Sequence, residues 1–89
     1  ISNGVILNSG SIIEHECTIE DFAHISPNVG IAGNVKVGKL THIGIGSSII
    51  QGIKIGINSI IGAGSVVVKD INSYKKAYGN PCKEIEDIK

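Results

Sequence analysis

The sequence predicts an all-β fold in which short parallel strands wind into a β-helix of about four triangular coils. Three observations predict it. An aliphatic residue recurs at every sixth position from Ile1 to Val67, and a small or β-branched residue stands two positions before each one from Leu7 onward. The large aliphatics are almost all Ile and Val, which favour strands over helices. Glycine, asparagine and serine recur between them and supply turns at short intervals.

Each repeat of six residues makes one strand and one corner. Residues two apart share a face of a strand, so the small residue and the aliphatic point inward and the residue between them points outward. The next three residues turn the corner. Three repeats form a coil of eighteen residues, so residues 1–71 make nearly four coils that stack in parallel ladders about 4.8 Å apart. The hand does not follow from the pattern, but a coil of hexapeptides resembles the left-handed β-helix.

The outward residues fall on three faces when the sequence is folded at eighteen. The first face carries Ile6, His24, His42 and Ile60, the second Ile12, Gly30, Ser48 and Val66, and the third Thr18, Lys36, Lys54 and Asn72. Aliphatic ladders on the outside of a prism indicate a covering partner. We therefore expect a homotrimer, because cyclic three-fold assembly suits a triangular prism.

The last segment, residues 72–89, lies beyond the period and is expected to cap the open end of the prism. Residues 82–89 place Ile85 and Ile88 on one side of a predicted short amphipathic helix. At the other end, the chain begins at Ile1 inside a repeat, which is typical of a fragment of a longer protein.

Composition excludes several functional classes. Eight basic and eight acidic residues cancel, so no nucleic-acid partner or anionic membrane surface is expected. No apolar run approaches the length of a membrane span, and no signal peptide is visible. Cys17 and Cys82 fit neither a metal knuckle nor a disulfide framework. They predict free thiols in a reducing cytoplasm.

His15 is the first candidate for chemistry. It occupies a predicted corner between Glu14 and Glu16, where the fold does not require an imidazole. A neighbouring carboxylate that accepts the Nδ1 proton would orient the ring and raise its basicity, as a general base requires. The alternative interpretation is a solvated surface histidine.

The other two histidines are eighteen residues apart and therefore stack on the first face. His24 and His42 either contribute to a site between chains or simply fill an interface. Three histidines on such a prism also suggest the zinc site of trimeric γ-class carbonic anhydrases. Those enzymes bring two histidines close together on one coil, whereas the gaps here are nine and eighteen residues, so no metal is expected. A non-catalytic structural trimer is the remaining alternative.

Three segments resemble bacterial hexapeptide-repeat sugar acetyltransferases. They are residues 13–17 (Ile-Glu-His-Glu-Cys), residues 21–27 (Asp-Phe-Ala-His-Ile-Ser-Pro) and the closing residues 79–83 (Gly-Asn-Pro-Cys-Lys), where Cys82 replaces the usual alanine. This family includes sialic acid O-acetyltransferases and N-acetyltransferases of nucleotide-linked 4-amino sugars. The similarity covers essentially the whole chain.

The resemblance implies transfer of an acetyl group from acetyl-CoA to an amine or hydroxyl of a sugar or nucleotide sugar, in cell-surface polysaccharide biosynthesis. It implies a cytoplasmic homotrimer with sites between subunits, a left-handed β-helix and no metal. N-acetylation and O-acetylation are not separated by these residues. Family members also carry an N-terminal α/β domain that binds the nucleotide. This chain has no counterpart, so we expect it to bind acetyl-CoA but to hold a nucleotide sugar poorly.

Site residues also follow from the resemblance. His15 is implied as the general base that deprotonates the acceptor, and Glu16 as the carboxylate that tunes it. His24 is implied as the residue from an adjacent subunit that contacts acetyl-CoA near its thioester. The residues implied to line the coenzyme channel are Gly33, Ile45 and Ala63.

Overall fold

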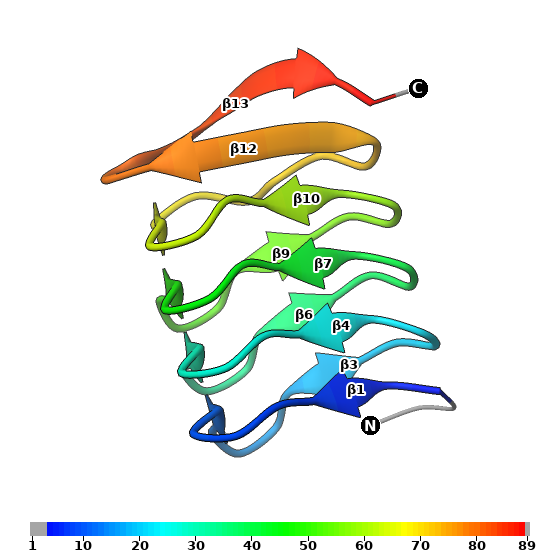
Figure 1. Cartoon of the computed structure of the whole chain (residues 1–89), viewed down its shortest axis with the longest axis vertical. Coiled ribbons are helices and arrows are strands. Elements are labelled where there is room, and N and C mark those ends of the chain that lie inside the picture. The colour runs from blue at the N-terminus through cyan, green and yellow to red at the C-terminus, as the bar shows by residue number, and fades with distance from the viewer. Residues whose placement is uncertain (1–3, 89) are drawn as a thin grey trace.

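The computed structural model describes residues 4–88 and contains no helix among them. Eleven strands of two residues each follow one another along the chain (Figure 1). They are β1 (Ile6–Leu7), β2 (Ile12–Ile13), β3 (Thr18–Ile19), β4 (His24–Ile25), β5 (Gly30–Ile31), β6 (Lys36–Val37), β7 (His42–Ile43), β8 (Ser48–Ile49), β9 (Lys54–Ile55), β10 (Ile60–Ile61) and β11 (Val66–Val67). Two longer strands, β12 (Lys75–Gly79) and β13 (Cys82–Asp87), end the chain.

From β1 to β8, each strand pairs in parallel with the strand three places further along the chain, which generates three sheets. Their strand orders are β1-β4-β7-β10-β12-β13, β11-β8-β5-β2 and β3-β6-β9. The register is eighteen residues throughout the coils; for example, Ile25 pairs with Ile43 in the first sheet. The predicted coil length is therefore confirmed. The stacked coils match the predicted left-handed parallel β-helix.

The inward positions of the repeat form the core. The recurring aliphatic is buried from Ile19 to Val67, and the small residue two positions before it is buried from Ala23 to Ser65. The hydroxyls among these small residues bond to the carbonyls of the next coil. Thr41 Oγ1 donates to the carbonyl oxygen of Gly56 at 2.6 Å, and Ser47 Oγ to that of Gly62 at 3.0 Å. Among the described residues, no buried side-chain nitrogen or oxygen therefore lacks a hydrogen-bond partner.

One residue at each corner has a positive φ, again with a period of six. These residues are Gly4, Gly10, Glu16, Phe22, Asn28, Asn34, Leu40, Gly46, Gly52, Asn58 and Gly64. Glycine and asparagine adopt this conformation readily, whereas Glu16, Phe22 and Leu40 do so at a cost. The corner geometry therefore overrides local preference at three positions.

The last coil is sixteen residues long, two residues shorter than the eighteen-residue period of the other coils. Ile71 forms a bridge with Ile55, only sixteen residues before it, and occupies the next core position. The carboxylate of Asp70 accepts the backbone N–H of Lys54 at 2.8 Å. The sequence pattern predicted that Asn72 would continue the third face above Lys54. The shorter final coil shows that this prediction was wrong.

The prediction of a short helix in residues 82–89 was wrong, because Cys82–Asp87 forms strand β13. β12 extends the first sheet beyond β10, and β13 pairs with it in antiparallel fashion (Figure 1). The cross-strand ion pairs Lys76–Glu86 and Lys75–Asp87 support this hairpin. Pairing with an open sheet satisfies the backbone of the tail, which outweighs a weak amphipathic pattern.

Candidate functional site

His15 lies in the turn between β2 and β3 and points into solvent. Its side chain is 80% exposed and that of Glu16 is 77% exposed. His15 Nε2 lies 3.9 Å from Glu16 Oε1, which is a charge contact and too long for a hydrogen bond. Glu16 is the residue with positive φ at this corner. A strained backbone therefore holds the carboxylate beside the imidazole.

Gly33 is the corresponding corner residue one coil further along the chain. The backbone N–H of Asn34 donates to the carbonyl oxygen of His15 at 3.1 Å, which fixes the two corners together. A Cβ atom at position 33 would lie 3.4 Å from His15 Cε1 and 3.5 Å from Nε2. The imidazole therefore lies over the glycine, and the missing side chain leaves space beside the ring.

His24 and His42 lie on the outer surface of the first sheet, in adjacent strands β4 and β7, as predicted. His24 Nε2 is 2.9 Å from Asn8 Nδ2, and His42 Nε2 is 3.1 Å from Ser26 Oγ. Partial desolvation lowers the pKa of His42 below its usual 6.5, and the neighbouring charge on His24 lowers it further.

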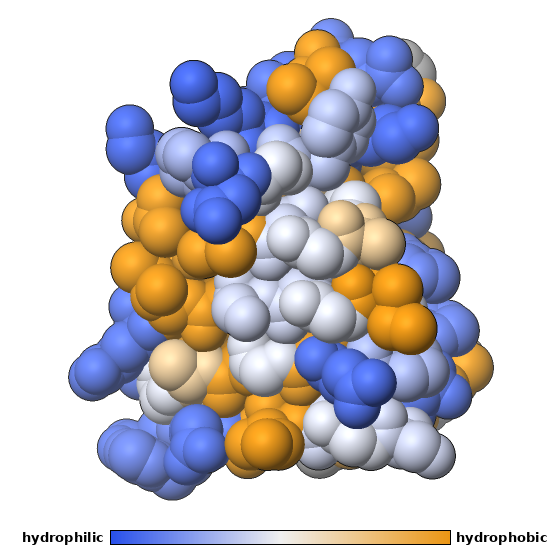
Figure 2. All heavy atoms as spheres, turned by 60° about the vertical axis from the view of Figure 1, so that its left-hand side comes forward, coloured by the Kyte–Doolittle hydropathy of each residue, from blue (hydrophilic) through white to orange (hydrophobic). Residues whose placement is uncertain are grey.

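Ile45 and Ala63 lie one coil apart at a different corner, in the turns that follow β7 and β10. The backbone N–H of Gly64 donates to the carbonyl oxygen of Ile45 at 2.8 Å. The coils approach closely here, since a Cβ at Gly44 would lie 2.6 Å from the backbone nitrogen of Ala63. Figure 2, which brings the left-hand side of Figure 1 forward, shows a pale stripe along the long axis with hydrophobic side chains on both sides.

The predicted site residues therefore divide into separate groups within one chain. His15, Glu16 and Gly33 share one corner, Ile45 and Ala63 share another, and His24 lies on a sheet surface. Within one coil, a whole strand of the second sheet separates the two corners. A single chain does not bring these residues together.

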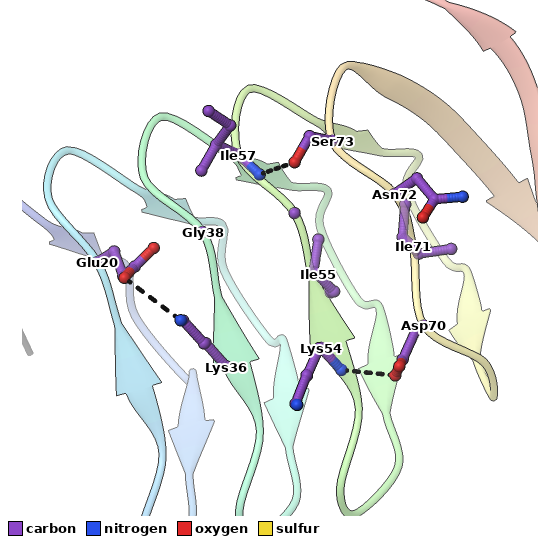
Figure 3. A pocket seen from close by; sticks show the side chains of 11 residues that line it. Glu20, Lys36, Gly38, Lys54, Ile55, Ile57, Asp70, Ile71, Asn72 and Ser73 are labelled. Atoms are coloured by element: carbon purple, nitrogen blue, oxygen red, sulfur yellow. Dashed lines mark hydrogen bonds and ion pairs between the residues drawn. The ribbon is translucent and has the colours of Figure 1, made fainter.

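A shallow pocket of about 360 Å³ opens on the third sheet, and no predicted site residue lines it. Figure 3 shows Glu20 pointing toward Lys36, Asp70 toward the backbone of Lys54, and Ser73 toward that of Ile57. Sequence reasoning missed this pocket because the sixteen-residue final coil creates it. A second pocket of about 270 Å³ on the second sheet includes Ile12, Glu14 and Gly30.

Metal-binding clusters and membrane-spanning helices are both absent from residues 4–88. In this part of the chain no three His, Cys, Asp or Glu side chains are grouped so that they could hold a metal ion. The same residues form no helix that is long and apolar enough to cross a membrane. Cys17 and Cys82 are both free thiols, half-buried and buried respectively.

Solved structures with the same architecture identify what the chain resembles. A histidine-substituted perosamine N-acetyltransferase from Caulobacter crescentus, in complex with CoA and GDP-perosamine, is 36% identical over 98% of this chain with a TM-score of 0.96. A maltose O-acetyltransferase from Clostridium difficile is 34% identical over 99% with a TM-score of 0.94. Both of these structural neighbours are sugar acetyltransferases. The resemblance inferred from the sequence is thereby confirmed.

The neighbours also include the acetyltransferase domain of PglB from Neisseria gonorrhoeae in complex with acetyl coenzyme A. It is 36% identical over 92% of this chain, with a TM-score of 0.91. This acetyltransferase-like β-helix spans 41% of the perosamine enzyme, 58% of the maltose enzyme and 40% of the PglB domain. No protein-family model matches the chain.

Proposed function

We infer that the chain carries the acetyl-transfer site of an enzyme that moves an acetyl group from acetyl-CoA to an amine or hydroxyl of a sugar or nucleotide sugar. The observation that carries this proposal is the near-complete coverage of the chain by acetyltransferases whose structures contain CoA or acetyl-CoA. The exposed pair of His15 and Glu16 supplies a base in a fold otherwise built from turns and aliphatic strands.

The proposed reaction is a direct displacement in a ternary complex. His15 accepts a proton from the acceptor amine or hydroxyl while the lone pair of that acceptor attacks the thioester carbonyl. The carbon–sulfur bond then breaks, the acetyl group stays on the acceptor, and the CoA thiolate leaves and takes up a proton. Glu16, held 3.9 Å from the imidazole, stabilises the positive charge that develops on it. No acyl-enzyme forms.

The assembly proposed for this chemistry is a homotrimer. The predicted residues lie on two corners and one sheet surface of a single chain, which supports a site completed by a second chain. In that site, His24 of a neighbouring subunit approaches acetyl-CoA. Exposed aliphatics on the first two sheets, Ile6, Ile12 and Ile60, support burial against a partner. Two faces of a prism can meet in a closed three-fold ring.

The setting proposed is the cytoplasm, with a product used for cell-surface polysaccharides. Two free thiols, Cys17 and Cys82, are compatible with a reducing compartment. The neighbours act on both amino sugars and maltose, according to their names, so the choice between nitrogen and oxygen acceptors is left to experiment.

The decisive experiment pairs coenzyme binding with turnover. Acetyl-CoA binding is measured by calorimetry on a sample whose oligomeric state is fixed by light scattering, and acetyl transfer is assayed on a panel of amino sugars and sugars. We expect His15→Gln to lower turnover by about 10² or more with acetyl-CoA affinity nearly unchanged. Equal loss of both would contradict the role of His15. A trimer that binds no acetyl-CoA would favour the non-catalytic structural alternative.

A further inference from the structure

The outer surface of the first sheet carries two histidines between two aliphatic residues. On the successive strands β1, β4, β7 and β10, the outward residues in register are Ile6, His24, His42 and Ile60. His24 has a role in the proposed function, because it approaches acetyl-CoA, whereas His42 has none. Another aliphatic at position 42 would continue the apolar column. The column therefore does not account for the second imidazole.

The rings of His24 and His42 lie against each other, with their centroids 4.5 Å apart. The χ2 torsion of a histidine has a broad energy profile, so the backbone of a strand does not by itself fix the plane of an outward imidazole. Contacts from neighbouring side chains must do so. The face of His42 therefore restricts rotation of the His24 ring.

The preceding coil holds one edge of each ring. Asn8 Nδ2 lies 2.9 Å from His24 Nε2, and Ser26 Oγ lies 3.1 Å from His42 Nε2. Each of these polar residues stands sixteen positions before its histidine, directly after the strand one coil earlier. Asn8 Nδ2 also donates to the carbonyl oxygen of Ile25 at 3.2 Å, and Ser26 is buried. Both rings are therefore held by anchored groups in the same way.

The electrostatics of His42 suit a supporting role. Partial desolvation, and then the charge of His24, lower the pKa of His42 below 6.5. At neutral pH its ring is therefore mostly uncharged. A neutral imidazole can lie against a second ring without repelling a charge on it, which a lysine or arginine at this position would not do.

We propose that His42 is a positioning residue that holds the imidazole of His24 in the orientation in which it meets acetyl-CoA. This inference rests on the proposed function and deepens it, because it assigns a role to a residue one coil beyond the coenzyme contact. Asn8 fixes the edge of the His24 ring, and His42 fixes its face. A contact residue that is held in its bound orientation before the ligand arrives lowers the cost of binding.

A double-mutant cycle tests whether His42 acts through His24. KM for acetyl-CoA and kcat are measured for the wild-type chain, His42→Ala, His24→Ala and the double variant, after light scattering has shown that all four have the same oligomeric state. We expect His42→Ala to raise KM roughly threefold to tenfold, the effect of one aromatic pair, and to leave kcat nearly unchanged. In the His24→Ala background it should have no further effect. Equal effects in both backgrounds would overturn the proposal.

Two replacements separate stacking from polarity. His42→Phe keeps a flat ring beside His24 but has no ring nitrogen, whereas His42→Gln offers Ser26 a polar group without a flat ring. We expect the Phe variant to restore KM to near the wild-type value and the Gln variant to leave it raised. Thr18→Ala, at an exposed outward position on β3, is the matched control and should keep the wild-type KM. Restoration by Gln but not by Phe would contradict positioning by the ring face.

The motion of the His24 ring gives a readout that needs no coenzyme. The order parameter of its Cδ2–Hδ2 bond is measured by carbon-13 relaxation in the ligand-free chain. We expect it to fall in His42→Ala and to return in His42→Phe, while the ring of His15, whose side chain is 80% exposed, stays mobile in every variant. If the wild-type chain binds no acetyl-CoA but this pattern occurs, the proposed function fails and the positioning of His24 stands. An unchanged order parameter in His42→Ala would overturn the positioning itself.

Discussion

The imidazole rings of His24 and His42 stack on each other on the outer surface of the first sheet. Their centroids are 4.5 Å apart and their planes differ by 26°. Asn8 Nδ2 lies 2.9 Å from His24 Nε2, at the edge of this stack. The stack is therefore stable when both rings are neutral and is opposed by charge on both.

Acidification is expected to destabilise the fold through this pair. The pKa of His42 is lowered from 6.5, first by desolvation and then by the charge of His24. The unfolded chain therefore binds a proton more readily than the folded chain, and stability falls as the pH drops below 6.5 toward the folded-state pKa. Urea unfolding should show a lower midpoint at about pH 5.5 than at about pH 7.5.

His42→Gln tests the origin of that pH dependence. Glutamine keeps a polar group near Ser26 but removes the titrating ring, so the difference between the two midpoints should shrink. His15→Gln is the control, because its ring stacks on no other imidazole. An undiminished pH dependence in the His42 variant would show that other groups are responsible.

Close stacking of the corners predicts a sharp contrast between two glycines. A Cβ at Gly44 would lie 2.6 Å from the backbone nitrogen of Ala63, whereas a Cβ at Gly30 meets no atom within 4 Å. Neither glycine has a positive φ. Gly44→Ala should therefore lower the free energy of unfolding by about 1–3 kcal/mol, and Gly30→Ala should leave it nearly unchanged. Similar denaturation midpoints for the two variants would show that the coils can separate locally.

The fold was predictable because one simple rule repeats. Inward aliphatics such as Ile31 and Ile49 recur at a fixed spacing, and each added coil reinforces the same register. The eighteen-residue register would place Ser73 beside Ile55, whereas the structure pairs Ile55 with Ile71, and the aliphatic period stops before it could indicate this sixteen-residue step. The tail was also misjudged, since Ile85 and Ile88 fit a short helix unless the open edge of β12 is known.

The candidate site was predictable only in part. Resemblance supplied the residue types, and the eighteen-residue period already places His15 and Gly33 on a different corner from Ile45 and Ala63. The distance from His15 to Glu16 and the position of the imidazole over Gly33 depend on side-chain geometry that spacing does not determine.

Strain at one corner predicts a stabilising substitution. Leu40 has a φ of 61° and is 51% exposed, whereas the equivalent position one coil further on is Asn58. A left-handed conformation costs a leucine about 1–2 kcal/mol, and asparagine tolerates it better. Leu40→Asn should therefore raise the unfolding midpoint. Ile85→Asn, at an exposed strand position with ordinary φ, should lower it, and a fall in both variants would contradict relief of strain.

Trimer formation through the first sheet is tested by placing a charge on it. Ile60 is 39% exposed on β10, and Thr18 is an exposed position on β3 of the third sheet, which is not assigned to any interface. Ile60→Glu would bury three carboxylates without partners in a ring of three chains, so light scattering should show dissociation to monomers. Thr18→Glu should remain trimeric.

If a second chain completes the site, the Ile60 variant should also lose acetyl-CoA binding. An Ile60 variant that stays trimeric would place the interface elsewhere, and a monomer that binds acetyl-CoA with full affinity would show that one chain is sufficient.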